Sequence, residues 1–312
     1  MLTEEARFQA FMDRINRGEK IEATDWMPEE YRLLLIKLIH MHGVSEIMGA
    51  YPEKEWVPKA PTLKRKLAIM AKVQDEVGHG QLLLRVVEDL AAPLNKTRED
   101  LIEDIYKNKV KFHNVFHMEA RSWADAGLIG WLVDGAAITI QASLLQSSYG
   151  PYARVLKRVC AEESFHMKHG ESIILALATG TPEQRKMLQE ALDYWWESLL
   201  FFFGPREITP AVDRMLYYRI RVLTNEELRQ KYLDKYVPRI QSLGIKIPDP
   251  QLRFDREKNC WVYTDPDWDR FSRMVHFNEG PKSRERVEMR RQAHEDQRWV
   301  REALLRARKQ AV

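Results

Sequence analysis

Glu76-Val77-Gly78-His79 and Glu163-Ser164-Phe165-His166 are two copies of a Glu-x-x-His motif, and they decide the fold that we expect for this chain. On an α-helix, positions i and i+3 lie on one face, so each motif directs a carboxylate and an imidazole toward a common point. One such motif means little, because a long helical protein contains a few by chance. Two of them, each preceded by a lone acid on an apolar segment, indicate a carboxylate-bridged two-metal site inside a four-helix bundle.

The lone acids precede the two motifs at nearly equal distances. Glu46 lies 30 residues before Glu76, and Asp134 lies 29 residues before Glu163. The predicted metal ligands are Glu46, Glu76, His79, Asp134, Glu163 and His166. Four carboxylates and two imidazoles that project inward from four helices match the ligand set of ferritin-like di-iron and di-manganese proteins. The sequence therefore predicts an all-α, ferritin-like four-helix bundle.

Asp134 is the stronger of the two lone acids when each is considered alone. It lies in the apolar run 127–145, where an unpaired charge would cost several kcal/mol unless metal ligation compensated it. Glu46 alone resembles an ordinary solvated helix residue, and the duplicated pattern selects it. Glu119 competes with Asp134, but it lies 44 residues before Glu163 and breaks the parallel with the first half.

Carboxylates suit hard, oxidisable metals and bridge pairs of them, which favours iron or manganese over zinc. We expect the four acids Glu46, Glu76, Asp134 and Glu163 to act in catalysis as well, by buffering the charge changes of the metals. Lys72 lies on the same helix face as Glu76 and His79. It either packs its stem on the bundle with the ammonium in water, or places a catalytic cation beside the metal pocket.

Four further residues lie close to the motifs. Asp75 and Glu162 directly precede the ligand glutamates, and they either orient the ligand histidines across the bundle or are simply solvated. His113 and His117 share a predicted helix face but lack partnered acids. We interpret these two histidines as helix-surface or pocket-wall residues.

Composition excludes several classes of protein. The 49 basic and 46 acidic residues give a net charge of only +3, so the surface is mixed and nucleic-acid binding gains no support. Two cysteines, Cys160 and Cys260, cannot form a disulfide framework or a four-cysteine iron–sulfur cluster, and they fit a reducing, cytoplasmic compartment. The N-terminal segment 1–14 is charged and has no apolar signal core.

The apolar run 127–145 is long enough to cross a membrane. Asp134 and Gln141 interrupt it, and we find no second candidate span in the sequence. A helix that is apolar on all sides with one central acid is typical of a buried core helix. We therefore expect no membrane segment.

Apolar periodicity, caps and breakers predict helices throughout the chain. The expected helices are 4–17, a long one from about 28, 62–90, 97–108, a helical stretch from 110 through 145, 152–178, 182 to about 203, 210–221, 225–241 and 284–308. Segment 51–61, with three prolines, is expected to be a loop, and 251–264 a β-hairpin that turns at 257–259. We predict a di-metal helical domain over 1–204 and a C-terminal annex over 205–312.

At these residues the sequence resembles a known family. AKVQDEVGHG (71–80), GWLVDGAA (130–137), SSYGPYAR (147–154) and EESFH (162–166) are similar to the catalytic subunits of ring-1,2-phenylacetyl-CoA epoxidases, which belong to bacterial multicomponent monooxygenases. DWMPEEYR (25–32), IPDPQLR (247–253) and DWDRF (267–271) are similar too. The resemblance covers nearly the whole chain.

This resemblance implies a di-iron centre that inserts one oxygen atom of O₂ into the aromatic ring of phenylacetyl-CoA. It also implies three partner proteins: a reductase that takes electrons from NADPH, a small accessory subunit, and a related metal-free subunit. The sequence has no Gly-x-Gly-x-x-Gly loop or cysteine cluster to bind a nicotinamide or an iron–sulfur relay itself. An external electron donor is therefore expected.

The phosphates of CoA require basic partners, for which we select Lys37, Lys72 and Lys111. The aromatic cluster 195–203 either packs in the core, lines the apolar pocket or faces a partner. Two other functions remain open from the residues alone. A di-manganese catalase would consume peroxide without a reductase, and an iron-storage protein or a metal-free scaffold protein would lack this turnover.

Overall fold

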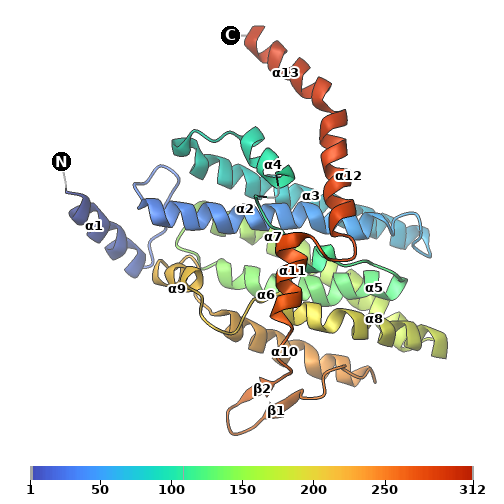
Figure 1. Cartoon of the computed structure of the whole chain (residues 1–312). Helices are drawn as coiled ribbons and strands as arrows, with labels where there is room; N and C mark the ends of the chain where they lie inside the picture. The colour runs from blue at the N-terminus through green and yellow to red at the C-terminus, as the bar shows by residue number, and fades with distance from the viewer. Residues whose placement is uncertain (1–2, 108, 311–312) are drawn as a thin grey trace.

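Four long helical segments form the centre of the molecule (Figure 1). The structure is a computed structural model that describes residues 3–107 and 109–310. The four segments are α2 (Glu29–Lys54), α3 (Leu63–Ala91), the stretch Trp123–Leu144 and α7 (Gly150–Ala178). This arrangement confirms the predicted all-α, ferritin-like bundle.

Shorter elements surround the bundle (Figure 1). They are α1 (Glu4–Asn16), α4 (Arg98–Tyr106), α8 (Pro182–Phe201), α9 (Pro210–Tyr217), α10 (Asn225–Ser242), α11 (Trp268–Phe277), α12 (Ser283–Asp296), α13 (Arg298–Gln310), β1 (Arg253–Asp255) and β2 (Cys260–Val262). The two strands form the predicted hairpin, with Asp255 paired to Cys260 next to the turn. The chain's last helices, α12 and α13, extend away from the body of the molecule.

The second half of the predicted repeat differs from the first. Residues 110–122, which we expected to be helical, are irregular except for the 3₁₀ turn Asn114–His117. The helix begins only at Trp123, because Ser122 and Asp125 form a reciprocal capping box. The helical stretch is then α5 (Trp123–Leu128), the π-turn Ile129–Val133 and α6 (Asp134–Leu144).

Two other boundaries also differ from the prediction. Helix α2 continues through Pro52 to Lys54, so the expected loop starts later than position 51. Pro52 and Glu53 are buried, which indicates that tertiary packing outweighs the helix-breaking tendency of proline here. The expected final helix 284–308 is two helices, α12 and α13, separated at Gln297.

Pairs of glycines bring the bundle helices close together. A Cβ at Gly80 of α3 would lie 2.3 Å from Ile47 Cγ1 and 2.8 Å from the carbonyl oxygen of Gly43, both on α2. A Cβ at Gly170 of α7 would lie 2.2 Å from the carbonyl carbon of Gly130, in the π-turn. The bundle therefore excludes side chains at these two contacts, which lie beside the two Glu-x-x-His motifs.

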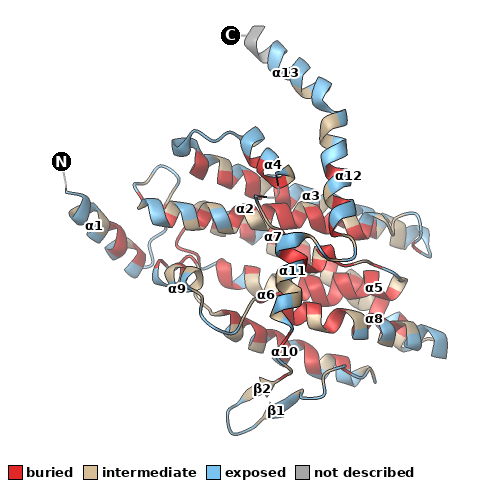
Figure 2. Ribbon diagram, viewed as in Figure 1, coloured by how far each residue is buried: buried red, intermediate tan, exposed pale blue. Residues whose placement is uncertain are grey.

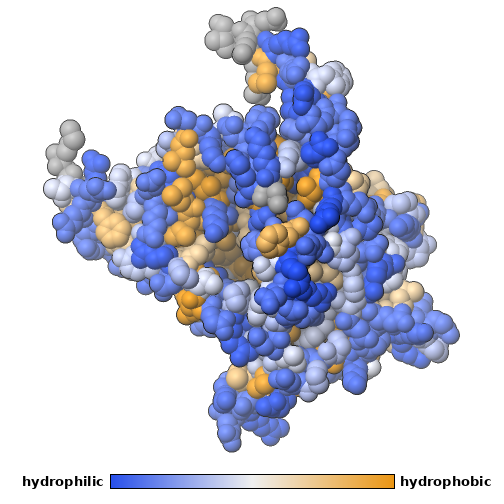
Figure 3. Space-filling view, viewed as in Figure 1, coloured by the Kyte–Doolittle hydropathy of each residue, from blue (hydrophilic) through white to orange (hydrophobic). Residues whose placement is uncertain are grey.

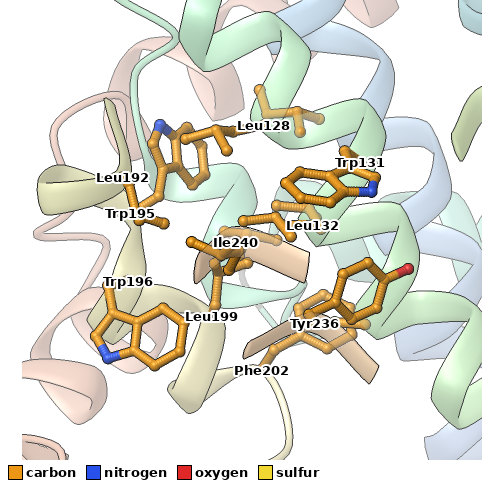
Figure 4. Packing of buried hydrophobic residues seen from close by; sticks show 14 of the residues in the cluster. Leu128, Trp131, Leu132, Leu192, Trp195, Trp196, Leu199, Phe202, Tyr236 and Ile240 are labelled. Atoms are coloured by element: carbon orange, nitrogen blue, oxygen red, sulfur yellow. The ribbon is translucent and has the colours of Figure 1, made fainter. Parts of the chain in front are cut away.

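The largest buried cluster joins the bundle to the C-terminal elements (Figure 2, red). Figure 4 shows Tyr236 and Ile240 of α10 packed near Trp131 and Leu132. The hydroxyl of Tyr232 donates to the carbonyl oxygen of Leu132 at 3.1 Å. The aromatic segment 195–203 lies in this cluster and packs in the core, with Phe202 also reaching the cavity described below.

Two helical stretches are long and apolar enough to cross a membrane by length and composition alone. They are Glu29–Lys54 and Trp123–Leu144, so our expectation of a single candidate was wrong. Their apolar windows are 56% and 72% buried inside the protein, and core helices of globular proteins pass the same test.

Candidate metal centre

The six predicted ligands converge in the interior of the bundle, and all of them are buried. Glu46, Glu76, His79 and Glu163 offer ligand atoms that lie within 4.8 Å of one another. Asp134, Glu163 and His166 form a second group of the same kind. Glu163 belongs to both groups, so its two oxygens are placed to bridge two cations.

Both histidines turn the same ring nitrogen toward the acids. Nδ1 of His79 lies 3.4 Å from Glu46 Oε2 and 3.6 Å from Glu163 Oε1. Nδ1 of His166 lies 3.2 Å from Glu163 Oε2 and 3.6 Å from Glu76 Oε1. The lone pairs of both rings can therefore serve a pair of metal ions between the helices.

The other ring nitrogens bind carboxylates nearer the surface. Nε2 of His79 lies 2.8 Å from Glu162 Oε2, and Nε2 of His166 lies 3.1 Å from Asp75 Oδ2. Each contact crosses between α3 and α7. A carboxylate on Nε2 holds the proton there and leaves Nδ1 unprotonated for a metal. Of the two interpretations of Asp75 and Glu162, the structure thus supports orientation of the histidines.

A hydrogen-bond network positions Glu46. Its Oε1 lies 2.7 Å from Nε2 of His42 and accepts from Nε2 of Gln141 at 3.2 Å. The Nδ1 atom of His42 in turn lies 2.8 Å from the hydroxyl of Tyr152. Three helices, α2, α6 and α7, thus fix the orientation of this lone acid.

Lys72 lies inside the bundle, with 2% of its surface exposed. Its ammonium contacts Asp134 directly, lies 2.6 Å from Glu53 Oε1 and 3.9 Å from Glu76 Oε1. Of the two interpretations of Lys72, the structure supports the buried cation beside the metal pocket. The ammonium faces carboxylates and is turned away from the surface.

The crowded acids shift one another's protonation. Burial and the charges of Glu163 and Glu46 raise the pKa of Glu76 well above its ordinary value. Burial also raises the pKa of Asp134 to about 7, against the opposing charge of Lys72. Burial opposes the charge of Lys72, but Asp134 and Glu53 outweigh it and raise the pKa of that ammonium. The site has more negative charge than its own side chains neutralise.

These residues fit a pair of hard metal ions. Nδ1 of His79 is buried and makes no hydrogen bond to any described residue, although it faces two carboxylates. A buried polar atom without a partner is costly, and a metal ion would satisfy it. Four carboxylates and two imidazoles form the donor set expected for iron or manganese.

An apolar cavity of about 80 Å³ reaches the acids. Its walls come from α2, α6 and α7 and from the loop before α5, and Figure 3 shows the surface hollowed between α2 and α6. The lining includes Leu38, Met41, His113, Phe116, Ala137, Ile140, Leu144 and Phe202. His113 is thus a pocket-wall residue, as one of our two interpretations held.

The remaining predicted residues lie outside the cluster. Lys37 is exposed on α2, one residue from the cavity residue Leu38. Nζ of Lys111 donates to the carbonyl oxygen of His276 at 3.2 Å. Glu119 is remote from the acids and lies 3.7 Å from Lys282 Nζ. His117 is buried and bonds Ser283, so it is not a helix-surface residue.

Sequence reasoning missed Glu53, His42 and Gln141. Each lies on the inward face of a ligand helix: Glu53 seven residues after Glu46, His42 four before it, and Gln141 seven after Asp134. This spacing was visible in the sequence. For Glu53, the nearby prolines hid the signal because they indicated a loop.

Comparison with known proteins identifies the family. The model of the phenylacetic acid catabolic protein family matches residues 7–299. The chain belongs to the phenylacetic acid catabolic protein family. One relative of this family member is a named component of the 1,2-phenylacetyl-CoA epoxidase of Escherichia coli (strain K12). The two are 43% identical over 305 residues, which cover 97% of this chain and 96% of that protein.

Proposed function

We propose that this chain is the catalytic subunit of a multicomponent monooxygenase that epoxidises the aromatic ring of phenylacetyl-CoA. The observation that carries the proposal is the convergence of Glu46, Glu76, His79, Asp134, Glu163 and His166 at the end of an apolar cavity. The similarity to an epoxidase component over nearly the full length of both proteins supports the choice of substrate.

In this proposal the six residues hold two iron ions, with Glu163 as the bridging carboxylate. When bound, the iron pair supplies two-electron reduction of O₂, so that one oxygen atom enters the ring and the other leaves as water. The residues of the chain set the conditions for this reaction. Asp75 and Glu162 hold the imidazoles in orientation, and His42 and Gln141 hold Glu46.

The cavity is suited to the aromatic ring of the substrate. Its walls are mainly aliphatic and aromatic, while the acids lie at one end. An apolar enclosure binds an arene and keeps water away from a reactive oxidant. The CoA moiety would extend outward, and Lys37, Lys72 and Lys111 stay predictions for its contacts. Of these, the buried position of Lys72 favours a role at the carboxylates.

The proposal requires other proteins. The relative is named as one of the subunits of its epoxidase, which indicates a multi-subunit enzyme. From the family resemblance we infer three cytoplasmic partners: an NADPH-dependent reductase, a small accessory subunit, and a metal-free related subunit. The division of this chain into a bundle domain (1–204) and an annex (205–312) also stays a prediction.

Metal analysis combined with a coupled assay tests the proposal. The iron-loaded chain, mixed with its partner subunits, reductase, NADPH and O₂, should convert phenylacetyl-CoA to a ring epoxide and contain about two irons. Glu163→Gln should lose most of its iron and turnover while keeping its helical circular dichroism. Glu171→Gln, on the same helix but bonded to Arg239, is the matched control and should behave as wild type.

Other outcomes would overturn the proposal. Oxygen evolution from peroxide after manganese loading, without epoxide formation, would indicate a catalase. Hundreds of irons per particle would indicate a storage protein. Full coupled activity in Glu163→Gln would show that the ligand assignment is wrong.

A further inference from the structure

Helices α3 and α7 present an apolar surface outside the ligand histidines. We call this surface the α3–α7 outer face and define it by exposed apolar residues. They are Leu63, Leu67, Met70 and Val77 of α3 and Phe165 and Leu175 of α7. Leu67 is 56% exposed and Phe165 is 48% exposed, so the face is not covered by other described parts of the chain. A contiguous apolar patch of this kind indicates a protein-binding site.

Gly78 is a second unusual feature of this face. It lies in the middle of α3, between Val77 and the ligand His79. A mid-helix glycine costs roughly 0.5–1 kcal/mol relative to alanine, and it is usually retained where another group approaches closely. A Cβ at Gly78 would meet nothing within 4 Å, unlike one at Gly80. Packing among the described residues therefore does not account for Gly78, and close approach of a partner does.

The face is also connected to both ligand histidines. Asp75 and Glu162, whose side chains are 35% and 30% exposed, each bond the outward Nε2 of one histidine. Both carboxylates line a surface hollow with Gly78 at its edge. One hydrogen bond thus links the protein surface to each imidazole that faces the metal cluster.

The charge of the surrounding surface is one-sided. Every exposed charged residue of α7 is basic, namely Arg154, Lys157, Arg158 and Lys168. Lys64 adds an exposed cation on α3. A basic rim around an apolar face is complementary to a partner whose docking surface has an acidic rim.

We propose that the α3–α7 outer face is the docking surface for the electron donor of the oxygenase, an acidic redox protein that carries a flavin or iron–sulfur group. The inference rests on the proposed function, because only a redox enzyme needs such a donor. Each turnover oxidises the donor by two electrons, which reduce the metal pair before O₂ is consumed. Docking over Gly78 brings the donor to the point where the surface is closest to both histidines.

Reduction by two routes tests the proposal. In the first, the complete iron-loaded enzyme receives electrons from NADPH through the reductase. In the second, it is reduced with dithionite without air and then mixed with O₂ and phenylacetyl-CoA for one turnover. Gly78→Gln and Leu67→Glu should lower the NADPH-driven rate at least tenfold and leave the product yield of the dithionite route unchanged. Phe277→Glu, at an exposed apolar position of α11, should change neither.

Several results would overturn the inference. Unchanged NADPH-driven rates in both variants would show that the donor docks elsewhere. Loss of the metal-free subunit from the purified complex would show that the face holds that subunit instead. A failure of the wild-type protein in the dithionite route would count against the proposed function itself, which separates the two failures.

Ionic strength provides an independent measurement. The NADPH-driven rate at limiting reductase should fall as salt rises from about 0.01 to 0.15 M, because salt screens attraction between exposed charges. Lys168→Glu should raise the reductase concentration needed for half-maximal rate and flatten this dependence. A salt dependence equal to that of wild type would contradict the assigned role of the basic rim.

Discussion

The ammonium nitrogen of Lys72 lies 2.6 Å from Oε1 of Glu53, and both side chains are buried in the bundle. The same ammonium contacts Asp134. Lys72 is thus an internal countercharge for acids at the edge of the metal cluster. An isolated carboxylate in such a place would be strongly disfavoured, so the lysine stabilises the bundle before metal binds.

Replacing Lys72 with methionine removes this countercharge but keeps the length of the side chain. We expect Lys72→Met to lower the free energy of unfolding of the metal-free protein by about 3–5 kcal/mol, because Asp134 and Glu53 lose their buried partner. Urea unfolding in the presence of a chelator measures this loss. In the metal-loaded protein the loss should be smaller, since the metals supply positive charge. An equal loss in both forms would contradict the interpretation.

A double-mutant cycle isolates the Lys72–Glu53 contact. Glu53→Gln alone should destabilise the metal-free protein, and the combination with Lys72→Met should cost less than the sum of the two. Coupling of about 0.5–3 kcal/mol is typical of residues in one ion-pair network. Additive effects would indicate that Asp134 alone pairs with the lysine.

Asp75 and Glu162 are expected to set metal affinity without binding metal. Asp75→Asn and Glu162→Gln weaken the hydrogen bonds that hold His166 and His79 in orientation. Loss of such partners typically costs about 10–100-fold in metal affinity. Competition with a chromophoric chelator measures the affinity, and circular dichroism checks the fold. Wild-type affinity in both variants would show that these acids are merely neighbours of the histidines.

Two glycines of α3 should respond to alanine in opposite ways. Gly80→Ala should destabilise the protein by about 1–3 kcal/mol, because the new methyl group overlaps Ile47 and Gly43 in the contact with α2. Gly78→Ala should stabilise the isolated chain by about 0.4–1 kcal/mol, because it meets open space and favours the helix. Thermal or urea unfolding compares them. Destabilisation by Gly78→Ala would reveal a constraint that the structure does not contain.

His117 should make stability depend on pH. Burial lowers the pKa of His117 to about 3, whereas a histidine in the unfolded chain titrates near 6.5. Between these values the unfolded state binds a proton that the folded state does not, so stability falls as pH decreases below about 6.5. At pH 5 the loss from this residue is about 2 kcal/mol.

The measurement compares unfolding free energies at pH 7.5 and pH 5. His117→Gln should show a smaller decrease than wild type, by about 2 kcal/mol, whatever its stability at pH 7.5. An identical decrease in both proteins would show that His117 is protonated in the folded state or is not buried there.

The metal-binding pattern was readable from the sequence because helical geometry is local. Residues three apart on a helix share a face wherever the helix lies, so Glu76 with His79 and Glu163 with His166 could be paired without a structure. The matched positions of Glu46 and Asp134 extended the pattern to four helices. The same local rules predicted α3, α7 and the β-hairpin closely.

Local rules failed where packing competes with propensity. Pro52 predicted the end of α2, yet the helix continues and buries Glu53 beside Lys72. The residues 110–122 were assigned to a helix, but the cap at Ser122 starts that helix later. In both places the outcome depends on contacts with other elements, which periodicity does not record.

The sequence by itself determined the helix type, the two Glu-x-x-His faces and the six acids and imidazoles, because each follows from spacing along one helix. Only the tertiary structure decided which groups meet across helices. It paired His79 with Glu162, His166 with Asp75, and Lys72 with Asp134 and Glu53. These partners lie between 19 and 91 residues apart in the chain, and their contacts depend on helix rotation and on the glycine contacts that set helix separation.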